Sequence, residues 1–398
     1  MKIIFNRFEM LTFLIGLLSI RIFSDLIDIV LLDSFLTALI MIISLSIIFL
    51  KRTEINHIGY IFLYLMLFSL FNGFMFSMNH DYLFLEPLRG FIRFLTIWTL
   101  FFIPYAINID TETFEENLYS FLVIPGTILV IVALITGGYN EYQGQMRLSF
   151  PFSNPNSLAL FSFLMIFISV LRLYTKKKAI FLVIILFYFY ALIKSGGITS
   201  TLSALLFISL SAFMYFSGLK KIIILLVVFT VISLFIYLTQ EFILARLDGV
   251  VFEDINTLTF SEGSSFFWRI RAWEVYLSTM EQWDFIIGHG IGVSRFILEP
   301  SSYISRYNAF SAPGTHNDYV QVLVDFGFVG LFILFFLCVN LFRKLYARTE
   351  ESPKSNIILA FCISLLIYMT MDNVLDSRFF FVIILLLSVY CKKNIGVQ

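Results

Sequence analysis

Long apolar runs alternate with short polar segments along most of the chain. A helix needs about 20 apolar residues to cross the hydrocarbon core of a membrane, and many of these runs reach or approach that length. The pattern predicts an all-α integral membrane protein with about twelve transmembrane helices and one large, partly helical outer loop. The expected spans are residues 9–27, 34–50, 58–77, 90–107, 119–136, 156–172, 179–194, 199–216, 221–239, 326–342, 356–371 and 378–391.

One polar segment, residues 240–325, is far longer than the others. It divides the chain into residues 1–239 with the first nine expected spans, the loop itself with short helices, and residues 326–398 with the last three. The chain has no evident internal repeat. A transporter built from inverted halves would place short, Gly- or Pro-broken spans symmetrically, whereas this loop falls late in the chain.

Lysine and arginine residues predict the orientation of the spans. With a cytoplasmic N-terminus, nearly every basic pair falls on the cytoplasmic side, as the positive-inside rule requires, and the opposite orientation would put all of them outside. We therefore expect both termini in the cytoplasm and the 240–325 loop outside. The inner basic residues are Lys2, Arg7, Lys51, Arg52, Arg172, Lys176, Lys177, Lys178, Lys220, Lys221, Arg343, Lys344, Arg348, Lys354, Lys392 and Lys393.

Composition supports a membrane protein, and the chain has no net charge. Hydrophobic residues make up 59% of the chain and charged residues 14%, against about 25% charged residues in soluble domains. The 27 basic and 27 acidic residues cancel, so the net charge gives no information about nucleic acid, and we expect no nucleic-acid partner. Cys338, Cys362 and Cys391 lie in or beside apolar runs without metal-ligand spacing, which predicts packing roles. The first apolar run lacks a cleavage site and is expected to remain as a helix.

The outer loop contains a predicted amphipathic helix at residues 265–281, lying at the membrane interface. Arg269 and Arg271 project away from its apolar stripe. Downstream, the glycine-rich stretch 288–292 predicts a tight turn that could let backbone approach a ligand. The apolar stripe consists of Trp268, Ala272, Tyr276 and Met280.

His316 is the most informative residue of this loop. Residues 316–325 predict a short helix, and Thr315 is a candidate N-cap. His316 would then lie in the first turn, where the helix dipole disfavours a positive charge and favours the neutral imidazole that a general base needs. Asp318 or another carboxylate could orient its second nitrogen. The alternative is an interfacial histidine bonded to a headgroup or a backbone carbonyl.

The other histidines give weaker signals. His289 is a weaker candidate for a general base than His316, because its two glycine neighbours indicate a turn. His57 at the inner face and His80 in a short outer loop are expected to be structural.

Outer arginines run against the positive-inside rule and therefore suggest a function. Arginine matches diphosphate oxygens in bidentate fashion, so Arg269, Arg271 and Arg147 are candidates to bind a lipid diphosphate. The alternative is that their side chains extend to phospholipid headgroups. Lys194, Arg89 and Arg93 lie within or beside spans and should face the bundle interior or an interface.

The chain has no Asp-x-Asp, no His-x-x-x-His, no P-loop and no dinucleotide motif. We therefore expect no metal and no cofactor.

Several motifs occur together between residues 145 and 342. They are Arg147 followed by Asn154-Pro155-Asn156, Arg271-Ala272-Trp273, Gly288-x-Gly290-x-Gly292, His316-Asn317-Asp318-Tyr319, and Asp325-x-Gly327-x-x-Gly330. With the late outer loop, they resemble the bacterial O-antigen ligase and O-antigen polymerase superfamily of membrane glycosyltransferases. In one respect the chain departs from this family. Many members have an arginine motif at the start of the eighth span, where this chain has Ser195 to Thr201 without arginine. Lys194 could supply that charge.

The resemblance implies transfer of glycan from an undecaprenyl-diphosphate carrier to an acceptor hydroxyl at the outer face of the bacterial cytoplasmic membrane. It implies that His316 activates or positions this hydroxyl, and that Arg271 and Arg147 hold the diphosphate, without metal. Arg269, Asp318, Asn317, His289 and Lys194 are the supporting candidates. The expected partners are lipid-linked oligosaccharide, acceptor glycan and membrane lipids, with a chain-length regulator as a further candidate.

Three functions remain open at this point. A polymerase that joins repeat units of a surface polysaccharide is favoured. A ligase that transfers finished glycan to lipid A-core uses the same donor chemistry. An exporter of lipid-linked sugar would need charged residues along its spans, whereas the polar residues here gather in one outer loop.

Overall fold

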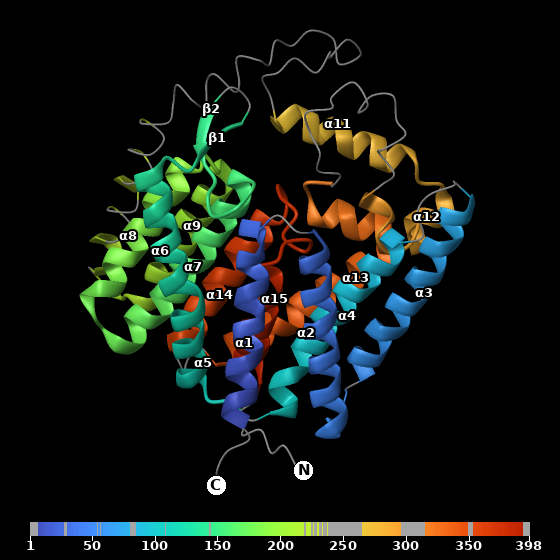
Figure 1. Cartoon of the computed structure of the whole chain (residues 1–398), viewed down its shortest axis with the longest axis horizontal. Coiled ribbons are helices and arrows are strands. Elements are labelled where there is room, and N and C mark those ends of the chain that lie inside the picture. Colours follow the sequence, from blue (N-terminus) through green and yellow to red (C-terminus); the bar gives the residue numbers. More distant parts are fainter. Residues whose placement is uncertain are drawn as a thin grey trace.

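The computed structural model describes residues 7–27, 30–53, 55, 57–79, 85–107, 109–142, 145–218, 220–223, 226, 229–230, 233, 237, 265–295, 315–348 and 353–392. Within these ranges the chain is almost entirely helical (Figure 1). The one sheet they contain is an antiparallel hairpin of β1 (Tyr139–Tyr142) and β2 (Gln145–Leu148), in which Tyr139 lies opposite Leu148. The sequence pattern did not predict this hairpin.

The helices follow the apolar runs closely. They are α1 (Arg7–Phe23), η1 (Ser24–Ile27), α2 (Val30–Leu50), α3 (His57–Asn79), α4 (Leu85–Ala106), α5 (Thr111–Leu118), η2 (Tyr119–Val123), α6 (Ile124–Thr136), α7 (Pro155–Lys176), α8 (Ala179–Lys194), α9 (Ile198–Tyr215), α11 (Ser265–Ser278), α12 (Gln282–Ile287), η3 (Val293–Arg295), α13 (Asp318–Tyr346), α14 (Pro353–Tyr368) and α15 (Phe380–Cys391).

Length and hydropathy support an all-α membrane protein, but they do not confirm twelve spans. Among the described residues, six helices are long and apolar enough to cross a membrane, and three shorter apolar helices accompany them. The expected ninth span, 221–239, lies largely outside the described residues. The six are Leu31–Leu50, Gly59–Met78, Thr111–Thr136, Pro155–Lys176, Ile198–Tyr215 and Asp318–Tyr346, and the shorter three are Ala179–Lys194, Lys354–Tyr368 and Phe380–Cys391.

The helices divide into central and peripheral ones. In α7, 78% of the residues in the apolar window are buried, whereas in α3 the share is 22%. Helix α7 therefore forms part of the core, where Phe167 stacks on Phe361 of α14 with ring centroids 3.8 Å apart. Apolar side chains that remain exposed on α3 suit contact with lipid rather than water.

The two ends of the helical bundle differ. Helices α11 and α12 and the β1–β2 hairpin lie at one end, and the first turn of α1 and the last turn of α15 lie at the other (Figure 1). This arrangement agrees with the predicted topology, in which both termini share a side and the large loop occupies the opposite one. Which side is cytoplasmic remains a prediction from the basic residues.

The glycine turn packs closely against the protein's own backbone. Gly290 has φ +116°, and a Cβ atom there would lie 2.0 Å from the backbone nitrogen of Gly73 in α3. A Cβ at Gly288 would lie 2.5 Å from the carbonyl carbon of Asp325 in α13. Gly327 has non-helical angles that break α13, and its Cβ position falls 2.3 Å from the carbonyl oxygen of Ile286. These glycines therefore allow α3, α13 and the turn to approach closely.

Replacing Gly290 with alanine should destabilise the protein by about 3 kcal/mol or more, because left-handed strain adds to a backbone clash. Thermal unfolding in detergent measures this loss. Gly137→Ala is a matched control, since its φ is also positive (+77°) but nothing lies within 4 Å of the added Cβ; strain alone should cost about 1–2 kcal/mol. Equal losses of stability in the two variants would contradict the proposed role of Gly290 in packing against α3.

Candidate functional site

A loop between α14 and α15, residues 369–379, is held against the start of α13. The carboxylate of Asp318 is fully buried and accepts hydrogen bonds from the backbone N–H groups of Val374 (2.9 Å) and Leu375 (3.0 Å). The backbone N–H of Asp318 donates to the carbonyl oxygen of Met369 (2.9 Å). Asp318 or another carboxylate was predicted to orient His316; in the structure the Asp318 carboxylate binds the backbone of this loop.

Helix α13 begins later than the sequence predicted. Asn317 is its N-cap, and the Asn317 side chain accepts hydrogen bonds from the N–H groups of both Tyr319 and Val320. His316 therefore precedes the helix rather than lying in its first turn. Asparagine is at least as strong an N-cap as threonine, which explains why α13 begins at Asn317 and not at Thr315. The prediction that a position in the first turn of the helix favours the neutral imidazole of His316 therefore does not apply.

His316 adopts a left-handed backbone conformation with φ +48°. Such a conformation costs a non-glycine residue about 1 kcal/mol, so its neighbours must stabilise it. The Thr315 hydroxyl donates to the carbonyl oxygen of Asn317 (2.8 Å), and the indole N–H of Trp273 in α11 donates to the carbonyl oxygen of Thr315 (2.7 Å). Strained residues of this kind gather at functional sites.

A carboxylate from the 369–379 loop lies beside the His316 ring. Asp372 Oδ1 is 3.9 Å from His316 Nδ1, and the Tyr368 hydroxyl donates to Asp372 Oδ2 (2.9 Å). Ser200 at the start of α9 donates in turn to the Tyr368 hydroxyl oxygen (2.9 Å). A line of polar groups thus runs from α9 through α14 to His316.

The charge state of Asp372 follows from these neighbours. Burial acts to raise the pKa of Asp372, but the neighbouring His316 and Arg269 side chains and the backbone N–H of Asn373 outweigh it, and the pKa lies below its ordinary value. Asp372 is therefore ionised at neutral pH. An ionised carboxylate at this position can orient the imidazole and stabilise its protonated form.

Asp372 and Tyr368 did not emerge from the sequence pattern. Asp372 lies in a short outer segment that reads Asp-Asn-Val-Leu-Asp-Ser-Arg between two apolar runs. The density of ionisable residues between spans was the available signal. Nothing in the sequence indicated that this segment would meet residues 315–318.

Helix α11 brings one of the two predicted arginines to this place. The positive charge of Arg269 acts on Asp372, and Arg269 lies one turn before Trp273, which bonds to Thr315. Helix α11 itself confirms the predicted amphipathic helix, because Ala272, Tyr276 and Met280 are buried. Arg271 also lies on α11, but its side chain is outside the described residues, as is that of Trp268.

Arg147 is buried at the start of α9. Its Nε donates to the carbonyl oxygen of Ser195 (2.6 Å) and its Nη2 to Asn156 Oδ1 (3.2 Å). Gly196, with φ +66°, leaves room for the guanidinium, since a Cβ there would lie 2.8 Å from Arg147 Nε. Arg147 thus contacts Ser195, which lies five residues before Ser200 in the chain. The Ser200 hydroxyl begins the line of polar groups to His316.

Two other candidates lie elsewhere. Lys194 is exposed, and its ammonium lies 5.6 Å from the ring centre of Tyr190. His289 is buried, with its ring 4.7 Å from that of Phe76 and its Nδ1 3.5 Å from Asp284 Oδ1. His80 lies outside the described residues.

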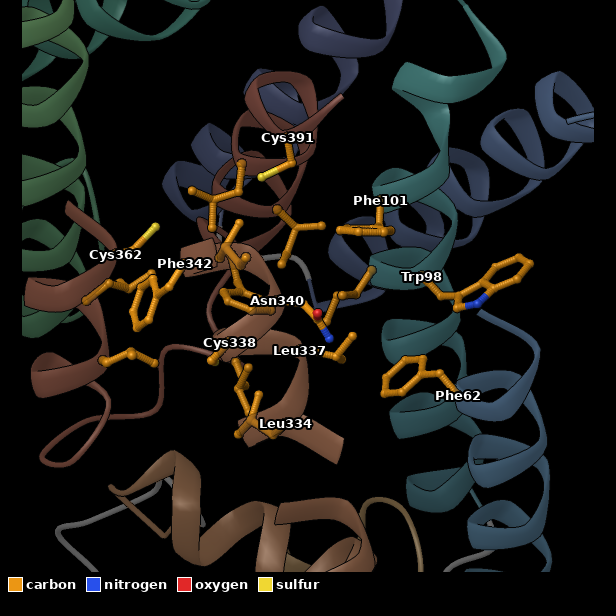
Figure 2. Close-up of a pocket in the computed structure, with 18 of the residues that line it drawn as sticks. Phe62, Trp98, Phe101, Leu334, Leu337, Cys338, Asn340, Phe342, Cys362 and Cys391 are labelled. Carbon is orange, nitrogen blue, oxygen red and sulfur yellow. The ribbon is translucent and has the colours of Figure 1, made fainter. Parts of the chain in front are cut away.

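An apolar cavity of about 280 Å³ extends between α3, α4, α13, α14 and α15. In Figure 2, Phe62, Trp98 and Phe101 line one side, and Phe342 and Cys362 line the other. Met369 and Leu375 of the 369–379 loop also line it, so the cavity reaches the loop from the side of the membrane core. All three cysteines, Cys338, Cys362 and Cys391, lie along its wall without a disulfide.

Within the described residues, no group of three or more His, Cys, Asp or Glu side chains could hold a metal ion. The cationic side chains near His316 are the groups there that could bind an anion.

Comparison with known families adds one finding. A family model described as O-antigen ligase matches residues 180–335, a range that includes α11, the glycine turn and His316. The match confirms the resemblance to the O-antigen ligase and polymerase superfamily. Arg147 and the 369–379 loop lie outside the matched range. No curated protein matches the chain.

Replacing Asp318 with asparagine should cost about 1–3 kcal/mol of stability, because one of its two buried hydrogen bonds to the loop is lost. Thermal unfolding and protease cleavage within residues 369–379 measure the effect. The matched control is Asp110→Asn. Asp110 is the exposed N-cap of α5 and accepts from Thr113, and asparagine caps equally well. A stable Asp318→Asn protein with a protected loop would contradict the proposed role of Asp318.

Proposed function

From the match of residues 180–335 to the O-antigen ligase family, we propose that this protein is a membrane glycosyltransferase that polymerises a bacterial surface polysaccharide. It transfers glycan from an undecaprenyl-diphosphate carrier to a sugar hydroxyl of another lipid-linked unit, at the outer face of the cytoplasmic membrane. The observation that carries the proposal is the strained His316 beside the carboxylate of Asp372.

In the proposed reaction His316 is the general base. The acceptor hydroxyl oxygen attacks the anomeric carbon of the donor sugar while the imidazole takes the hydroxyl proton. The bond between the anomeric carbon and the diphosphate oxygen breaks, and the diphosphate leaves with the bonding electrons. Asp372 holds the imidazole in place and stabilises the imidazolium that forms, as a buried carboxylate does for a catalytic histidine elsewhere.

Arginine side chains stabilise the leaving diphosphate. Its negative charge grows as the bond breaks, and fixed guanidinium groups can stabilise that charge without a metal. Arg269 acts on Asp372 already, and Arg271 lies on the same helix, so α11 would present positive charge to the leaving group. Metal independence forms part of the proposal.

Arg147 compensates for the missing family arginine. Related proteins often have an arginine at the start of the eighth span, where this chain has Ser195 and two glycines. The Arg147 guanidinium lies against Ser195 and Gly196 and so supplies positive charge at that place from another part of the chain. Lys194, the substitute expected from the sequence, is directed to Tyr190 instead.

The alternatives differ in their fit to the structure. A ligase would use the same residues with lipid A-core as acceptor. An exporter would need polar groups along a path through the spans, but the cavity between α3, α4, α13, α14 and α15 is lined almost wholly by apolar side chains. This lining favours a fixed site at one end of the bundle.

His316→Ala should lower glycan transfer by about 10²–10⁴-fold, the usual contribution of a general base. Polysaccharide chain length on a gel, measured in a deletion strain that expresses the variant, reports the loss. Asp372→Asn should reduce transfer less, because the base remains but loses its orientation. His57→Ala is the control, since His57 is exposed at the start of α3. Normal chain length at normal protein level in His316→Ala would exclude the catalytic role.

The deletion strain also separates the three functions. A polymerase deletion should leave single repeat units on the cell surface. Long chains that accumulate on the lipid carrier would instead indicate a ligase, and lipid-linked units that accumulate on the inner leaflet would indicate an exporter. Analysis of surface and lipid-linked glycans decides among them.

A further inference from the structure

At the outer end of the apolar cavity, two arginines share one carboxylate. We infer that Arg93 and Arg295 bind the diphosphate of a second lipid, the polyprenyl-linked acceptor, whose hydrocarbon chain occupies the cavity. This inference rests on the proposed function, because a polymerase must hold two lipid-linked substrates at once. The site is distinct from the His316 site, and the sequence motifs did not indicate it.

The arginine pair carries a net positive charge. Arg93 of α4 forms an ion pair with Asp376 Oδ1, and Arg295 of η3 places its Nη2 2.8 Å and its Nε 3.2 Å from Asp376 Oδ2. Two guanidinium groups therefore meet one carboxylate. The side chains of Arg93, Arg295 and Asp376 are 15%, 21% and 14% exposed, so the cluster is largely shielded but remains accessible. A phosphate group could bridge the two arginines as the carboxylate does.

Residues that neighbour this cluster in the chain line the cavity. Arg93 lies one and two helical turns from Ile97 and Phe101 of α4, which line the cavity. Leu375, the residue before Asp376, also lines it. On the other wall, Phe380, Ile384, Leu387 and Cys391 form one stripe along α15, which spans roughly 16 Å at 1.5 Å per residue. A long apolar cavity with a cationic cluster at one end fits an amphiphile with a phosphate head and a hydrocarbon tail.

The two sites lie on the same short loop. Asp372 faces His316, and Asp376 faces the arginine pair. Between them, the N–H groups of Val374 and Leu375 are bound to Asp318, so the loop separates the sites at a fixed spacing. A donor at the His316 site and an acceptor at the arginine pair would then present their sugars to each other above the loop.

The rival explanation is a structural ion-pair network that joins α4, η3 and the loop. The two explanations differ for Asp376→Asn. If Asp376 only completes a network, its loss weakens the fold and changes no binding. If it competes with a phosphate for the two arginines, its loss should strengthen phosphate binding, because both guanidinium groups become available.

The binding experiment uses the purified full chain in phosphatidylcholine nanodiscs, with undecaprenyl diphosphate as the probe. The wild-type protein should bind two equivalents. Asp376→Asn should tighten one of these binding steps by about 3–10-fold. The triple variant Arg93→Gln, Asp376→Asn, Arg295→Gln replaces all three charges with amides, leaves no unpaired carboxylate, and should bind one equivalent.

A matched control lies on the same helix. Arg89 is exposed and pairs with Glu86, so Arg89→Gln should retain two equivalents and wild-type affinity. Any of three results would overturn the inference. They are binding of one equivalent of undecaprenyl diphosphate by the wild-type protein, binding of two equivalents by the triple variant, and unchanged affinity in Asp376→Asn. Equal competition by phosphatidylglycerol would assign the site to ordinary phospholipid, and equal competition by inorganic pyrophosphate would exclude the cavity as a tail site. Either result would also overturn it.

A transfer assay with separate donor and acceptor completes the test. The triple variant should raise the KM for the acceptor about tenfold or more, with the KM for the donor unchanged within about twofold. Equal rises in both would contradict the inference. If the wild-type protein transfers no glycan, the proposed function fails, while the binding stoichiometry still decides whether the second lipid site exists.

Discussion

The buried carboxylate of Asp318 determines the arrangement of one end of this helical bundle. By accepting from Val374 and Leu375 it holds the 369–379 loop against the first turn of α13. A fully buried carboxylate needs such partners, because an uncompensated charge in a place without water is very costly. The contact joins residues more than fifty positions apart in sequence, and both the His316 site and the arginine pair are built on the loop that it fixes.

The loop carries its two aspartates toward different neighbours. Asp372 lies with His316, Tyr368 and the charge of Arg269, whereas Asp376 lies with two arginines. Helices that are far apart in the sequence meet here. Ser200 of α9 donates a hydrogen bond to Tyr368, and Trp273 of α11 donates one to Thr315. Because the loop is shared, one small region would orient the proposed base and also gather cationic groups for the proposed diphosphate.

Part of the candidate site could be predicted from the sequence. His316 and Arg269 stood out because polar residues in an apolar chain are rare, and because arginines at the outer side oppose the positive-inside rule. Asp372 was not predicted, since a carboxylate in a short segment between spans has no spacing that relates it to a distant histidine. Asp318 was one candidate to orient His316, but the carboxylate beside the ring is Asp372. A residue two positions from His316 can still point toward another partner once a helix begins between them.

The sequence by itself determined the class of the protein and the place of its polar chemistry. Apolar runs require helices in a membrane because the backbone must satisfy its own hydrogen bonds there, and the glycines at 288–292 predicted a tight turn. Only the tertiary structure decided which distant groups meet: that Asn317 begins α13, that the glycine turn packs on α3, and that residues 369–379 face His316. These contacts depend on the packing of whole helices, which local pattern and spacing do not contain.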